Sequence, residues 1–183
     1  MTAQMPDELE YNGETYSIIG VKGEGLFEAR DLGLIPLPSS TACWRGNIMK
    51  YRCEEKQLIL DEIIVNSKNT PTINGVDPQP NSPSFNYTYR NLNLMIKFTG
   101  GILIAKDFIQ SMYVHMGFQR PIAFEKVIEI QMEEGNIISV KNLSHEMEKL
   151  RNKNPDEGSQ PESSSKEDIG KWVEKTFSRD YEL

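Results

Sequence analysis

Paired short segments of alternating apolar and polar residues, joined by tight-turn residues, recur along most of this chain. The clearest pair flanks Asn12-Gly13, within residues 9–21. Both turn residues tolerate a positive φ, and Asn-Gly between alternating segments is the strongest short-range signal for a β-hairpin. Three further pairs are centred on residues 54–56, 99–101 and 133–135. Hairpins that follow one another in this way predict an antiparallel meander.

The hairpins extend over residues 9–142, so the sequence predicts a mainly β (α+β) fold of about eight strands. The meander could close as a barrel or stack as a sandwich, and closure would remove exposed edge strands. The strands are followed by a helical segment. The hydroxyl of Ser144 can accept a hydrogen bond from an unpaired backbone N–H, which predicts a helix from His145 to about Lys153.

The composition divides the chain of 183 residues into three parts. Residues 1–153 are predicted to form one antiparallel β domain with its terminal helix. Residues 154–168 contain no apolar side chain that could offset the entropy of ordering, so they are predicted to be a flexible linker. Residues 169–183 place Trp172 and Phe177 at helical spacing, which predicts a short amphipathic helix. This helix could fold back on the domain or bind a partner.

Charge and hydropathy argue against several classes of partner. The net charge is −7 and the isoelectric point is near 5.0, whereas a general nucleic-acid binder gains its affinity by neutralising phosphates. No apolar run approaches the roughly 18 residues of a membrane-spanning helix. The first residues are acidic and unlike a secretory signal. With only two cysteines, the chain is therefore expected to be cytoplasmic with reduced thiols, and to bind neither nucleic acid nor membrane.

The sequence lacks the specific signatures of common active sites. Dinucleotide-binding, P-loop, zinc-protease, nucleophile-elbow and EF-hand motifs are all absent from it. Two histidines are too few for a histidine-rich metal site, and no cofactor is indicated. The absence of these motifs therefore favours a binding function over catalysis.

A first candidate site is residues 39–46, where a thiol, an indole and a guanidinium are adjacent. Cys43 could be a nucleophile if Arg45 and a neighbouring histidine lowered its pKa. Alternatively, Cys43 is a small buried apolar residue, Trp44 fills part of the core and Arg45 pairs with an acidic neighbour. Strand parity would place Cys43 and Arg45 on one face, which the nucleophile needs. We favour the structural alternative.

A second candidate site is residues 113–121, which contain His115 and Arg120. Histidine is the side chain best able to transfer protons near neutral pH, and arginine can bind a carboxylate or phosphate. A half-buried histidine bonded to a backbone carbonyl and a surface ion pair of Arg120 are the simpler interpretations, and we favour them.

A third candidate is the proline- and asparagine-rich stretch 66–91, which carries Tyr87 and Tyr89. Long loops in compact domains are usually functional or disordered, and tyrosines form contact surfaces at low entropic cost. The stretch is either a recognition element or a tolerated insertion, and the sequence favours neither.

Three functions follow from these observations. The favoured one is a soluble, bacterial-type protein-interaction module, like an antitoxin or immunity protein in its acidic composition. Its expected partner contacts are aromatic: Tyr87, Tyr89, Trp172 and Phe177. The first alternative is a β-barrel that binds a small ligand through aromatic and cationic residues: Trp44, Arg45, Tyr51, Tyr113, His115, Phe118 and Arg120. The second alternative is an enzyme that uses Cys43 and His115.

Overall fold

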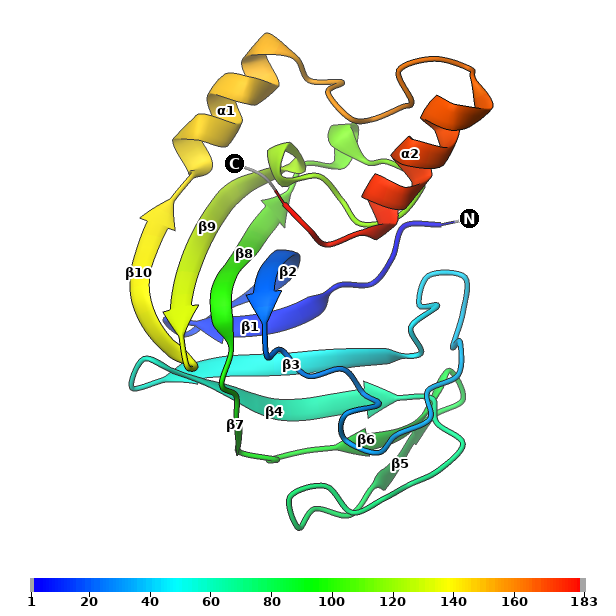
Figure 1. Cartoon of the computed structure of the whole chain (residues 1–183), viewed down its shortest axis with the longest axis vertical. Coiled ribbons are helices and arrows are strands. Elements are labelled where there is room, and N and C mark those ends of the chain that lie inside the picture. The colour runs from blue at the N-terminus through cyan, green and yellow to red at the C-terminus, as the bar shows by residue number, and fades with distance from the viewer. Residues whose placement is uncertain (1, 182–183) are drawn as a thin grey trace.

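One continuous sheet of ten strands dominates the computed structural model, which describes residues 2–181 (Figure 1). The strand order is β10-β9-β8-β2-β1-β3-β4-β6-β5, with β7 beside β4. The strands are β1 (Asp7–Tyr11), β2 (Glu14–Glu24), β3 (Asn47–Glu54), β4 (Gln57–Val65), β5 (Gln79–Ser82), β6 (Phe85–Tyr89), β7 (Leu94–Met95), β8 (Thr99–Phe108), β9 (Phe124–Glu133) and β10 (Asn136–Asn142). The prediction of a mainly β fold with C-terminal helices is confirmed.

Three of the four predicted hairpins are present. Asn12 and Gly13 join β1 to β2 with φ values of 52° and 76°. The turns from β3 to β4 and from β9 to β10 likewise contain pairs of residues with positive φ. Two consecutive positive φ values give the turn a twist that matches the twist of the flanking strands. These turns are therefore determined by residues within a few positions of each other.

The predicted hairpin at residues 99–101 is wrong. The short β7 pairs with β4, whereas β8 begins at Thr99 and pairs with β2 and β9. Gly100 lies opposite Gly23 of β2, and a Cβ on Gly100 would be 2.1 Å from the carbonyl oxygen of Lys22. The glycine therefore permits a close approach of two strands instead of a turn.

The predicted meander is also interrupted in two places. After β8 ends at Phe108, the chain forms the 3-10 turn η1 (Gln110–Met112) and an irregular loop up to a second 3-10 turn, η2 (Pro121–Ala123). The sheet is also not a purely antiparallel meander, because β1 and β3 are parallel. The chain returns to start β3 through the connection 25–46, which a hairpin pattern does not predict.

The sheet coils around its core and joins itself at one point. Asn136 of β10 pairs with Gln57 of β4, and two backbone hydrogen bonds of 2.8 Å flank this pair. The inner face is filled by fully buried side chains such as Leu9, Ile63 and Phe98. These side chains fill the space inside the coiled sheet, where the small-ligand barrel would need a cavity for its ligand.

Two helices lie at the same end of the molecule (Figure 1). The first, α1 (Ser144–Lys153), packs against β9 and η2. Ser144 is not its cap: the preceding Leu143 is, and the Ser144 hydroxyl accepts a hydrogen bond from the backbone N–H of Val127 at 3.1 Å. The second, α2 (Lys166–Phe177), is capped by Ser165, which accepts a hydrogen bond from Asp168. No helix among the described residues is long and apolar enough to cross a membrane.

Candidate functional site

The residues that follow α2 lie in an extended conformation across the sheet domain, between the helical end and β2 (Figure 1). We call residues 177–181 the C-terminal segment. Phe177, Arg179 and Tyr181 occupy alternate positions in it, and each of the three contacts the domain. Phe177 is the last residue of α2, whereas Arg179 and Tyr181 belong to the extended part, in which alternate side chains point to the same side. The arrangement is that of a bound peptide, although the segment belongs to the same chain.

Phe177 contacts an aromatic platform. Its ring stacks on Trp44 with a centroid distance of 5.4 Å and an angle of 20° between the planes. The backbone N–H of Phe118 donates to the carbonyl of Thr176 at 2.9 Å. A Cβ on the neighbouring Gly117, whose φ is +65°, would lie 2.3 Å from that same carbonyl oxygen. The glycine is therefore needed for the loop to come this close to the end of α2.

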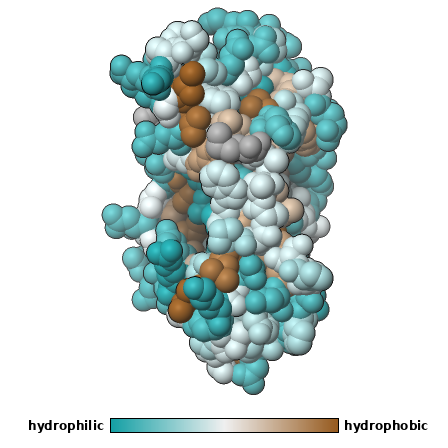
Figure 2. Space-filling model, turned by 90° about the vertical axis from the view of Figure 1, so that its right-hand side faces the viewer, coloured by the Kyte–Doolittle hydropathy of each residue, from teal (hydrophilic) through white to brown (hydrophobic). Residues whose placement is uncertain are grey.

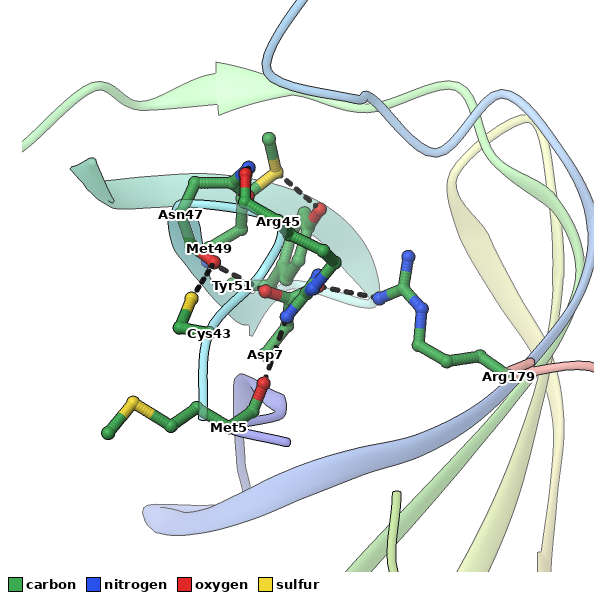
Figure 3. A network of polar contacts seen from close by, with 8 residues as sticks. All are labelled: Met5, Asp7, Cys43, Arg45, Asn47, Met49, Tyr51 and Arg179. Atoms are coloured by element: carbon green, nitrogen blue, oxygen red, sulfur yellow. Dashed lines mark hydrogen bonds and ion pairs between the residues drawn. The ribbon is translucent and has the colours of Figure 1, made fainter. Parts of the chain in front are cut away.

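Arg179 binds the most buried carboxylate of the site, Asp7 (Figure 3). Its Nη1 is 2.6 Å from Oδ2 of Asp7, and Nη1 of Arg45 is 2.8 Å from the same oxygen. The other carboxylate oxygen accepts a hydrogen bond from the backbone N–H of Met49 at 2.8 Å. Asp7 is only 2% exposed, so its charge requires these partners. One arginine comes from the domain and the other from the C-terminal segment.

The electrostatics of Asp7 follow from this geometry. Burial on its own would raise the pKa of Asp7. The charges of Arg45 and Arg179, with the hydrogen bonds from Arg45 and Met49, outweigh burial and hold the pKa below its ordinary value. The carboxylate is therefore ionised at neutral pH and attracts a cation to this position.

Arg45 is held in place by the domain. Its Nη2 donates to the carbonyl of Met5 at 3.0 Å, and its own carbonyl accepts a hydrogen bond from Asn47 at 3.0 Å (Figure 3). Its guanidinium carbon also lies 5.6 Å from the ring centroid of Phe118. These contacts of Arg45 do not involve the C-terminal segment, so the pairing of Arg45 with Asp7 does not depend on it.

Tyr181 lies in a slot where two strands lack side chains. A Cβ on Gly20 of β2 would be 2.6 Å from the Tyr181 ring, and a Cβ on Gly101 of β8 would be 2.1 Å from its hydroxyl. The hydroxyl donates to Oε1 of Glu129 at 2.9 Å. Burial first, and then the Glu129 contact, raises the pKa of Tyr181. The phenol is therefore neutral and acts as a hydrogen-bond donor.

A cavity of ≈ 580 Å³ lies beside the C-terminal segment. The domain contributes Ile19, residues of the 114–122 loop and the α1 residues Met147 and Leu150, whereas the opposite wall is formed by α2 and the C-terminal segment. About half of the lining side chains are apolar, and the others are polar or charged.

The residues predicted to bind a ligand are only partly brought together. Trp44, Arg45 and Phe118 meet at the C-terminal segment, and Phe118 and Arg120 line the cavity. Tyr51 is wrongly predicted as a lining residue, because it is 2% exposed and its hydroxyl donates to the sulfur of Met49 beneath Asp7.

Tyr113 and His115 are exposed. Their hydroxyl oxygen and Nδ1 are 3.2 Å apart, so the two side chains contact each other. Neither of them lines the cavity of the ligand candidates Phe118 and Arg120.

The aromatic residues predicted to contact a partner are engaged within the chain. Trp172 donates from its indole nitrogen to the carbonyl of Gly158 at 3.0 Å, and Phe177 stacks on Trp44. Tyr89 is fully buried and donates to the carbonyl of Pro71 at 2.9 Å, so its expected role in a contact surface is wrong. Tyr87 is half-buried and packs against the core. In stretch 66–91 these tyrosines serve packing because β6 turns them towards the core.

Cys43 lacks the surroundings of a nucleophile. It is 1% exposed, and its thiol donates to the carbonyl of Asn47 at 3.5 Å. Burial raises the pKa of this thiol in spite of the opposing charge of Arg45, and a reactive thiol needs the opposite shift. No hydrogen bond within residues 2–181 joins Cys43 to His115. Across the same residues, no three histidine, cysteine or acidic side chains gather as metal ligands would.

The most informative residues of the site were missed by sequence reasoning. Asp7, Arg179, Tyr181 and Gly20 were not singled out. The alternation of Arg179 and Tyr181 directly after the end of α2 at Phe177 is a usable signal for an extended segment with one contacting side. Their counterparts in the domain are far away in sequence, so no local pattern could pair them. Comparisons of this chain with family models, curated proteins and solved structures found no match.

Proposed function

We propose that the protein is a protein-binding module whose binding face receives an extended segment with the pattern aromatic-x-Arg-x-Tyr. The chain's own C-terminal segment occupies this face. The observation that carries the proposal is the buried carboxylate of Asp7, which binds one arginine of the domain and one arginine of the segment. A charge buried at 2% exposure must be compensated, and here part of the compensation comes from Arg179 of the C-terminal segment.

The contacts of the C-terminal segment resemble a recurring mode of peptide recognition. In that mode an extended peptide lies along a strand, its main chain supplies affinity, and pockets for alternate side chains supply specificity. The N–H of Val21 in β2 donates to the carbonyl of Arg179 at 2.8 Å. The platform at Trp44, the carboxylate of Asp7 and the slot at Gly101 then select an aromatic ring, a cation and a phenol in this order.

The surface around the site favours specific contacts over broad apolar burial. Figure 2 shows hydrophobic side chains in small separate groups among hydrophilic ones on the face to the right of Figure 1. The net charge of −7 favours encounter with a basic partner. Both observations support an acidic module that binds an arginine-bearing segment of a basic protein, as an immunity protein or antitoxin would.

A peptide-binding experiment with the full chain tests this proposal. The Arg179→Gln variant weakens the internal contact but leaves Asp7 paired with Arg45. A fluorescent peptide with the sequence of residues 174–183 should bind this variant more tightly than the wild-type chain, because the internal segment competes less. The matched control peptide carries Gln in place of the arginine and should bind at least ~10-fold more weakly, as expected for loss of a charge-assisted hydrogen bond.

A second variant tests whether the peptide binds at this site. Trp44 is 47% exposed, so Trp44→Ala should leave the fold intact while it removes the aromatic platform. Adding Trp44→Ala to the Arg179→Gln chain should abolish peptide binding in fluorescence anisotropy. Equal binding of the natural and control peptides, or no binding to the Arg179→Gln chain, would refute the proposed function.

A further inference from the structure

The cavity beside the C-terminal segment has two walls of different origin. The domain wall includes Val114, Phe118, Ile122 and Leu150, and the opposite wall includes Trp172 of α2. Its volume of ≈ 580 Å³ is within the range of roughly 300–1,000 Å³ that is typical of small-molecule sites. Leu150 is 41% exposed although it is apolar and lies on α1. An apolar ligand portion would remove this exposed surface from water.

One cation of the cavity lacks an anionic partner. Arg120 donates from Nη1 to the carbonyls of Pro155 and Glu157, at 3.2 and 2.6 Å, and from Nη2 to the carbonyl of Met112 at 3.3 Å. Its Nε is buried and has no hydrogen-bond acceptor within the described part of the chain. All acceptors of this guanidinium are thus neutral, and no ion pair of Arg120 is present among residues 2–181. Burial lowers the pKa of Arg120, and the charges of Asp156 and Glu157 nearby offset this only in part, as expected for a desolvated charge that is incompletely compensated.

The remaining charged groups of the cavity are exposed. Lys175, Glu157 and Asp180 all belong to its lining, and all three are accessible to solvent. Their two negative charges and one positive charge are screened by water. Arg120 is the charged lining group with restricted access to water. An anionic group of a ligand would therefore gain the strongest electrostatic interaction at Arg120.

We propose that this cavity binds an amphipathic small molecule, with its apolar chain between Phe118, Leu150 and Trp172 and its anionic head group at Arg120. The proposal rests on the cavity and its charges and does not depend on peptide recognition. It has one consequence for the C-terminal segment. Since the ligand would contact both walls, it would bind the docked state of α2 more tightly than the open state, and it would therefore hold the segment in place.

Decanoate below its micelle concentration is a suitable probe for the full chain. The chain has two tryptophans, and Trp44→Phe keeps a ring for the stack with Phe177 while leaving Trp172 as the single fluorophore. Decanoate should change the Trp172 fluorescence saturably and raise the Tm. Decylammonium, which has the same chain and the opposite charge, should bind at least ~10-fold more weakly. Absence of saturable decanoate binding, or equal binding of both probes, would overturn the proposal.

Two substitutions locate the binding site. Arg120→Gln should reduce the preference for decanoate over decylammonium to within about threefold, as expected if the guanidinium supplies the discrimination. Because Arg120 also holds the 155–157 backbone, Leu150→Asp provides a second variant at an exposed position, and it should abolish decanoate binding. Its matched control is Ile138→Asp, an equally polar change at a 62% exposed residue of β10 outside the cavity. Decanoate binding by the Leu150→Asp chain at the strength of the control would place the ligand elsewhere and refute the proposal.

Discussion

The strongest test of the docked C-terminal segment is amide exchange in the Arg179→Gln chain. The substitution removes one charge-assisted hydrogen bond of 2.6 Å to a carboxylate that is 2% exposed. The side chain of Arg179 is itself 26% exposed, so solvent screens the contact only in part. Hydrogen bonds to charged groups contribute about 1.5–3 kcal/mol. Asp7 stays paired with Arg45, so the larger cost of an isolated buried charge does not arise.

The structure supplies reporters for this free energy. The amide of Val21 donates to the carbonyl of Arg179 in the C-terminal segment, and the amide of Phe118 donates to the carbonyl of Thr176 in the last turn of α2. A loss of about 1.5–3 kcal/mol from local docking should speed their exchange by roughly 10- to 150-fold. The amide of Leu58 donates across the β4–β10 junction and is the internal control. Its exchange should change little, because opening of the sheet does not depend on the segment.

The measurement is hydrogen exchange followed by NMR on the wild-type and variant chains at neutral pH. Faster exchange of all three amides would mean that the substitution lowers global stability and that the segment is part of one cooperative unit. Unchanged exchange at Val21 and Phe118 would mean that Arg179 contributes nothing to docking. The first result would refute docking of the segment as a step separate from global unfolding, and the second would refute the assignment of Asp7 and Arg179 as the main docking contact.

Three further predictions concern single sites. Gly101→Ala should displace Tyr181, since the new Cβ would lie 2.1 Å from the Tyr181 hydroxyl. Amide exchange should then show docking weakened by about 1–3 kcal/mol. Adding Tyr181→Ala should cancel this effect, and an effect of Gly101→Ala that persists without the Tyr181 ring would contradict the slot. Because the pKa of Asp7 is below its ordinary value of 3.8, its stabilising contribution is complete above that value and is lost as pH falls through the lowered pKa. Urea unfolding at falling pH should therefore show a smaller acid-induced loss of unfolding free energy in Asp7→Asn than in the wild-type chain. A thiol reagent should modify Cys43 far more slowly than free cysteine until urea is added, because burial raises the pKa of Cys43. A rate equal to that of free cysteine would instead support a nucleophilic role for Cys43.

The hairpins were predictable because their information is local. Asn12 and Gly13 adopt positive φ for reasons contained in these two residues. The same reasoning misread Gly100, since a glycine that permits two strands to approach looks identical in sequence to a glycine that permits a turn. Only the identity of the facing residue, Gly23 of β2, distinguishes these cases.

The site was predictable only in fragments. Trp44 and Arg45 were recognised as unusual neighbours, Phe118 as a ligand-binding candidate and Phe177 as part of an amphipathic helix. Their shared location was not predictable, because it results from the return of the chain's end to the domain.

The sequence by itself determined the strand-rich class, the positions of three turns and the existence of a C-terminal helix, because each depends on residues close together along the chain. The tertiary structure alone decided that Asp7 and Arg179 meet, although 172 residues separate them. It also decided that Tyr181 enters a slot made by glycines of two different strands. A buried charge and a steric slot become binding features only when distant segments are packed together, and residue patterns of short range do not encode that packing.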